Sequence, residues 1–274
     1  MEEYGRGVAG GLLFSLPLLY TMEMWWAGLS VGPGALLLYV GLTLVLLLGY
    51  NRYAGMRRDA SWVEVGIDSI EEMGIGLVLA ALVLYLLGRI TGDMPASEVL
   101  GKIIVESMSV AVGISIGTAQ LGGESKDTGA SDGLHPGKSE DSKHPDHVAQ
   151  VVLAFCGAVL FAANVAPTEE IVIIGIETST WKLLGLVALS LMVGATILFY
   201  SDFVGSSHFV RRDGLFWFAG DMMMSYSAAL LAAGLMLWFF HGFEGVPPRV
   251  AVSQLVVLAF PASLGASAGR LLIQ

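Results

Sequence analysis

Eight long apolar runs constrain this chain more than any other feature. Each run is continuous rather than alternating and has about the 20 residues that a helix needs to cross a bilayer, whereas a barrel strand has about ten. With 55% hydrophobic and only 14% charged residues, the chain does not have the composition of a water-soluble enzyme. We therefore predict an all-α membrane protein with eight transmembrane helices: Val8–Leu29, Gly34–Tyr50, Met73–Ile90, Val99–Leu121, Val148–Ala166, Leu183–Tyr200, Leu215–Phe240 and Val250–Ile273.

The charged residues predict the surroundings and the orientation of the chain. A net charge of −10 argues against a nucleic-acid partner, because phosphate binding requires a basic surface. If the N-terminus is inside, ten of the 14 lysines and arginines fall on the cytoplasmic side. We therefore expect a protein of the inner (plasma) membrane of a prokaryote, with both termini cytoplasmic. The expected partner is the lipid bilayer, and the sequence leaves a homo-oligomer open.

An internal repeat organises the chain. Leu12–Gly28 matches Val159–Gly175 at an offset of 147 residues, and Gly113–Gly117 matches Gly265–Gly269 at an offset of 152. Because each repeat holds four spans, both copies enter the membrane in the same direction. We expect two parallel four-helix repeats, related by a pseudo-twofold axis along the membrane normal. Residues 1–121 form the first repeat, residues 122–147 form a polar cytoplasmic linker, and residues 148–274 form the second repeat.

The repeat selects two pairs of carboxylates as candidate cation ligands. Glu23 aligns with Glu170 near the outer ends of the first and fifth spans, and the accompanying hydroxyls are those of Thr21 and Thr168. If these spans are central, the two glutamates face each other and either share a proton or hold a hard cation; the alternative is simple solvation at the interface. At the inner side the repeat preserves Asp68 and Asp221, which are candidates for a site, for helix starts or for arginine pairing.

Other polar motifs have simpler interpretations. Arg57 and Arg58 align with Arg211 and Arg212; they are expected to anchor cytoplasmic loops, with an inner gate or a contact with anionic lipid as the alternatives.

On the fourth span, Glu98, Lys102 and Glu106 stand four residues apart, and their expected counterparts are Ala251, Leu255 and Ala259. A Lys102–Glu106 ion pair is the simplest interpretation, and a polar water path is the alternative. The repeated Gly-x-Ser-x-Gly motifs predict close helix packing rather than hydrolase chemistry, which requires a strand, a histidine and an aspartate.

The chain resembles a family of prokaryotic integral membrane proteins of about this length. The resemblance rests on Glu23–Trp26 (EMWW) after the first span and Pro167–Glu170 (PTEE) after the fifth. It implies a multi-span membrane fold and carries no activity, substrate or catalytic residue.

The leading hypothesis is a transporter or exchanger of H⁺ or a small metal ion that uses the repeated carboxylates. The alternative is a membrane scaffold or sensor that acts through the acidic linker Gly122–Asp146, whose histidines leave metal binding open. An enzyme is not expected, because no pair of nucleophile and base occurs at membrane depth. The sequence implies no cofactor and does not identify a metal.

Overall fold

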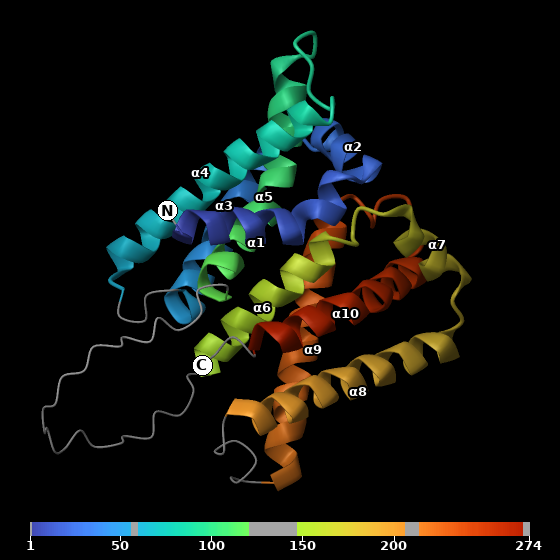
Figure 1. Ribbon diagram of the computed structural model, residues 1–274. Coiled ribbons are helices and arrows are strands. Elements are labelled where there is room, and N and C mark those ends of the chain that lie inside the picture. The colour runs from blue at the N-terminus through green and yellow to red at the C-terminus, as the bar shows by residue number, and fades with distance from the viewer. Residues whose placement is uncertain (1, 56–59, 121–146, 206–213, 271–274) are drawn as a thin grey trace, which may run out of the picture.

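The computed structural model describes residues 2–55, 60–120, 147–205 and 214–270, and these ranges contain helices and no strand (Figure 1). The predicted all-α class is confirmed. The two halves share one order of helices, in which the second helix is short and has nine residues. The first half comprises α1 (Glu2–Leu19), α2 (Met22–Ser30), α3 (Pro33–Ala54), α4 (Trp62–Leu86) and α5 (Ala96–Gln120), and the second comprises α6 (His147–Ala163), α7 (Glu169–Glu177), α8 (Thr180–Gly205), α9 (Gly214–Phe239) and α10 (Pro248–Arg270).

Six of the described helices are long and apolar enough to cross a membrane, whereas the sequence predicts eight spans. Helix α6 is apolar but has only 17 residues, and α1, with 18 residues, is not among the six. The structure therefore supports a multi-pass helical membrane protein, and the eight-span count is not confirmed. The six candidate spans are Pro33–Ala54, Trp62–Leu86, Ala96–Ala119, Thr180–Ile197, Ala219–Phe239 and Pro248–Arg270.

The first and fifth predicted spans are each interrupted by a helix break. Helix α1 contains Pro17 and ends two residues later, at Leu19, and Thr21 has extended backbone angles (φ −96°, ψ 132°) before α2. Pro167 lies between α6 and α7 and lacks the N–H that a continuing helix would need. Thr168 then begins α7 with similar angles (φ −79°, ψ 142°). Each long apolar run is thus divided into one long and one short helix.

The outer faces of the long helices carry large apolar side chains. Leu37 on α3, Val63 on α4 and Trp181 on α8 are 74%, 71% and 83% exposed, respectively. A water-soluble surface rarely gathers so many such residues, and they are suited to contact with lipid tails. The distribution of exposed residues therefore agrees with the composition in placing the chain in a bilayer.

Helices α5 and α10 form the centres of their halves. Helix α5 packs against α1 to α4, and α10 packs against α6 to α9. The glycines of the repeated Gly-x-Ser-x-Gly motifs allow direct contact between backbones, so the predicted role in helix packing is confirmed. These approaches use equivalent positions, namely Gly10 against Gly113 and Gly117, and Gly157 against Gly265 and Gly269.

The two halves meet mainly through α3 and α6. The ring of Tyr39 on α3 also stacks on Phe239 of α9, with centroids 4.1 Å apart. Figure 1 shows the blue-to-green half above the yellow-to-red half, with α2 and α7 on the same side of the molecule. An exact twofold axis would require α8 to pack against α1 as α3 packs against α6, and the described residues show no comparable contact.

Candidate functional site

The carboxylate of Glu106 is the most unusual polar group in the described part of the chain. Glu106 is the eleventh of the 25 residues of α5, about 15 Å from the start of that helix. Its side chain is 0% exposed, and neither carboxylate oxygen has a hydrogen-bond partner. An ionised carboxylate in such surroundings costs several kcal/mol, so Glu106 requires a proton or a cation.

Tyr39 connects Glu106 to the contact between the halves. Its phenol interacts electrostatically with the Glu106 carboxylate, and its hydroxyl has no hydrogen-bond partner. The stacked ring of Phe239 approaches the same tyrosine from the second half. The buried Ser109 hydroxyl, three residues beyond Glu106 on α5, also lacks a partner. A buried acid with unused polar groups nearby therefore lies close to where the halves meet.

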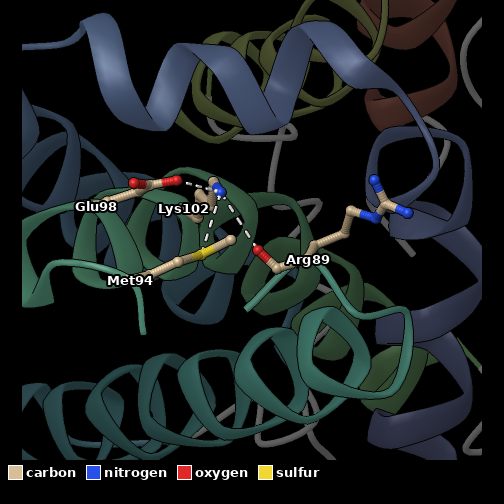
Figure 2. A network of polar contacts seen from close by, with 4 residues as sticks. All are labelled: Arg89, Met94, Glu98 and Lys102. Carbon is tan, nitrogen blue, oxygen red and sulfur yellow. Dashed lines mark hydrogen bonds and ion pairs between the residues drawn. The ribbon is translucent and has the colours of Figure 1, made fainter. Parts of the chain in front are cut away.

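Lys102 does not pair with Glu106, contrary to the simplest prediction. Its ammonium donates to Glu98 Oε1 at 2.6 Å and to the Arg89 carbonyl at 3.3 Å, and it approaches the Met94 sulfur at 3.7 Å (Figure 2). Only 6% of the lysine is exposed. Because a helical side chain leans toward the N-terminus of its helix, Lys102 reaches Glu98 more readily than Glu106.

Glycine contacts show which residue of α10 is equivalent to Lys102 of α5. Gly28 of α2 lies against the backbone of Lys102, and the equivalent Gly175 of α7 lies against Gln254 of α10. Lys102 therefore corresponds to Gln254 rather than to Leu255. Gln254 is 0% exposed, and neither side-chain amide atom has a hydrogen-bond partner. The second half thus keeps a buried polar group here but has no cation.

A polar cluster joins three helices at the far end of the first half. Asn51 on α3 donates to Glu72 Oε2 at 2.7 Å and to the Ser69 hydroxyl at 3.1 Å, both on α4. Ser115 on α5 donates to Asn51 Oδ1 at 2.7 Å. Asn51 is not among the site residues predicted from the sequence. The available signals were an asparagine directly after an apolar run and a serine inside the repeated motif.

Asp221 lies in the corresponding region of the second half but is neutralised by an arginine. Arg270 Nη2 lies 3.1 Å from Asp221 Oδ1 and donates to Gln150 Oε1 at 2.9 Å, while Nη1 donates to Ser225 Oγ at 3.0 Å. Of the interpretations open from the sequence, arginine pairing is therefore the one observed for Asp221. Its repeat partner Asp68 is half-buried on α4, one turn before Glu72.

The structure does not bring the predicted outer pair together. Glu23 is half-buried in the first turn of α2, and Glu170 is exposed in the first turn of α7. Helix α2 packs against α5 and α7 against α10, with no substantial contact between α2 and α7 in the described ranges. Thr21 and Thr168 instead directly precede these helices and donate to the carbonyls of Leu18 and Val165, at 2.9 and 2.8 Å.

Several predicted positions fall in parts of the chain that the structure does not describe. Arg57, Arg58, Arg211, Arg212 and the linker Gly122–Asp146 lie outside the described residues. Within the described ranges, no group of three or more His, Cys, Asp or Glu side chains is arranged to hold a metal ion.

A small cavity between α8, α9 and α10 has a volume of about 10 Å³. That volume is enough for about one water molecule, and Ser267, whose hydroxyl has no hydrogen-bond partner, is one of the lining residues.

Comparison with known families identifies the kind of protein. A family model with the description "Putative integral membrane protein (DUF2391)" matches residues 3–273. The chain belongs to the DUF2391 family. Searches of curated proteins and of solved structures found no match. The family resemblance inferred from the sequence is thereby confirmed, and this DUF2391 protein is a multi-pass integral membrane protein. The family description names no activity.

Proposed function

We propose that this DUF2391 protein is a cation transporter or exchanger in which a proton or a small metal ion binds at Glu106. The observation that supports this most directly is a fully buried carboxylate, in the middle of a candidate span, with two unpartnered oxygens. A proton and a hard cation compete for the same oxygens. Alternating occupation of Glu106 therefore provides a way to couple a cation to a proton.

Serines lie between Glu106 and one end of α5 along the helix axis. Ser109 follows Glu106, and Ser115 lies nine residues from it, about 14 Å along the helix. Ser115 contacts Asn51, which in turn binds Glu72. These groups offer oxygen ligands and hydrogen bonds to an ion or to water. We place the inner end of the route at this cluster, with Asp68 at its opening.

At the opposite end, Glu23 and Glu170 remain in the proposal as solvated carboxylates that attract cations. The two halves then have different roles, because Arg270 occupies the second cluster and repels cations from Asp221. We keep the orientation predicted by the lysines and arginines, with both termini cytoplasmic in the inner membrane. We also keep the parallel repeat, which the shared order of helices supports.

Ion flux into proteoliposomes tests this proposal. The full chain is screened with H⁺, Na⁺, K⁺, Mg²⁺, Ca²⁺ and Mn²⁺, with and without a pH gradient. We expect Glu106→Gln to lower the flux at least tenfold, because the neutral amide neither releases a proton nor supplies a charged ligand. Glu177→Gln is the matched control, since Glu177 is exposed at the end of α7. Unchanged flux in Glu106→Gln would overturn the proposal.

Two further variants separate parts of the mechanism in the same assay. The double variant Glu23→Gln with Glu170→Gln is expected to lower the flux less than Glu106→Gln, because these glutamates are partly or fully solvent-accessible. Deletion of residues 122–146 is expected to leave most of the flux. Loss of function on that deletion alone would instead favour a scaffold or sensor that acts through the linker.

A further inference from the structure

One buried cation lies between two carboxylates on the same helix. Glu98, Lys102 and Glu106 are separated by four residues each, so they follow one another along one face of α5. Lys102 holds Glu98 at 2.6 Å, whereas Glu106 has no hydrogen-bond partner. A single ammonium group therefore has two acids within reach of its side chain and contacts one of them.

The observed pairing is the one that helix geometry favours when Glu106 is neutral. A glutamate four residues before a lysine interacts with it better than a glutamate four residues after it. The Arg89 carbonyl and the Met94 sulfur, near the turn between α4 and α5, also contact the ammonium (Figure 2). The carbonyl and the sulfur are uncharged acceptors close to the turn. An ionised Glu106 would instead offer the ammonium a full negative charge in a buried position.

We infer that Lys102 is an exchangeable counter-ion, which pairs with Glu98 while Glu106 holds a proton or cation and turns to Glu106 when that carboxylate is ionised and empty. The inference rests on the proposed function and adds its coupling step. When Lys102 leaves Glu98, it also leaves Arg89 and Met94. The occupancy of Glu106 is thereby linked to the turn between α4 and α5.

Among the side chains that the structure describes around Glu106, this role falls to Lys102, and the described side chains of α1 include no ionisable group. From α3, the Tyr39 phenol interacts electrostatically with Glu106 but carries no positive charge. On the other helices that pack against α5, Glu72 of α4 binds Asn51, Glu23 lies in the first turn of α2, and the Cys156 thiol of α6 contacts the Leu46 carbonyl. The second half does not repeat this arrangement, because Gln254 replaces the lysine in α10.

Infrared spectroscopy of the full chain in lipid vesicles tests the exchange directly. The carbonyl band of the protonated Glu106 carboxyl is identified by its loss in Glu106→Gln and is followed at the pH where it has half its maximal intensity. Lys102→Met is expected to strengthen the band, because the ionised form loses its counter-ion. Glu98→Gln is expected to weaken the band, because Lys102 is released toward Glu106. Each change in the ratio of protonated to ionised Glu106 is expected to be about tenfold.

Matched variants keep the result decisive. Lys102→Arg preserves the charge and should hold the band near its wild-type intensity, and Lys182→Met, at an exposed lysine of α8, should leave it unchanged. If Glu98→Gln fails to fold, the difference in band intensity between Lys102→Met and Lys102→Arg still tests the counter-ion role of Lys102. The inference is overturned if the band intensity is unchanged in Lys102→Met, or if it changes in the same direction in Lys102→Met and Glu98→Gln. Lys102 would then have only a structural role.

The infrared result is independent of transport. If the band responds in opposite directions while no ion is transported, the exchange of Lys102 stands and the proposed function fails. If ion transport depends on Glu106 and the intensity of the band does not change in the Lys102 variants, the proposed function stands and the counter-ion role fails.

Discussion

At the scale of residues, the buried ionisable groups differ in how their charges are compensated. Lys102 and Arg270 each contact a carboxylate and further polar groups. Glu72 accepts a hydrogen bond from Asn51, whereas Glu106 has none. A compensated charge contributes to the fold, and an uncompensated one requires a proton or ligand. This difference, and not the number of acids, singles out Glu106.

The Arg270 cluster makes a prediction about stability. Arg270→Met leaves Asp221 and Gln150 without their charged partner, so we expect a loss of about 3 kcal/mol in the free energy of unfolding. Adding Asp221→Asn should recover part of this loss, because no buried charge then remains unpaired. Unfolding by denaturant in detergent micelles measures both effects. Equal stability of wild type and Arg270→Met would show that the cluster does not hold α6, α9 and α10 together.

At the scale of elements, close contact between helix backbones explains how the central helices are positioned. Glycines let α1 approach α5, and α6 approach α10, without intervening side chains. The short helices α2 and α7 use Gly28 and Gly175 in the same way, against Lys102 and Gln254. The breaks after α1 and α6 therefore allow a second glycine contact on each central helix.

Glycine-to-alanine substitutions test this packing. A Cβ atom at Gly10 would meet the backbone of Gly117, and one at Gly157 would meet the carbonyl of Gly265. We expect each substitution to cost about 1–3 kcal/mol in unfolding free energy. Gly41→Ala and Gly185→Ala are the matched controls, because a Cβ there meets nothing within 4 Å. They should be neutral or stabilising by up to about 1 kcal/mol, through the higher helix propensity of alanine. Destabilisation of all four variants alike would argue against a specific role for the contacts.

At the scale of the whole molecule, the two halves share an order of helices but not their chemistry. The first half holds Glu106, Lys102 and the Asn51 cluster, and the second has Gln254 and Arg270 at the corresponding levels. A duplicated scaffold of this kind permits one half to bind an ion while the other supports it. The stacked rings of Tyr39 and Phe239 form one contact between the two halves.

The parallel repeat predicts the sidedness of two turns. Cys156 is the single cysteine of the chain, so replacing it with alanine provides a background for labelling. Asp93→Cys, between α4 and α5, and Glu244→Cys, between α9 and α10, are both exposed positions. A membrane-impermeant maleimide added to intact cells should label both, whereas Ser61→Cys should react only after permeabilisation. Labelling of Asp93→Cys and Glu244→Cys from opposite sides would contradict the parallel repeat.

Several features could be predicted from the sequence because they depend on local or average properties. The apolar runs predict an all-α membrane protein, and the repeated glycines predict helix packing. The site was harder to predict. The i, i+4 spacing allows Lys102 to pair with Glu98 or with Glu106, and a one-residue change in offset decides between Leu255 and Gln254. Such choices depend on side-chain direction and on contacts between distant segments.

The sequence by itself determined that this chain lies in a membrane, consists of helices and belongs to the DUF2391 family, because hydropathy and family similarity accumulate over the whole length. Only the tertiary structure decided which ionisable groups are compensated. It paired Arg270 with Asp221 and Lys102 with Glu98, separated Glu23 from Glu170, and left Glu106 buried without a partner. The physical reason is that compensation of a buried charge requires a few ångströms of proximity, and packing between helices sets that proximity.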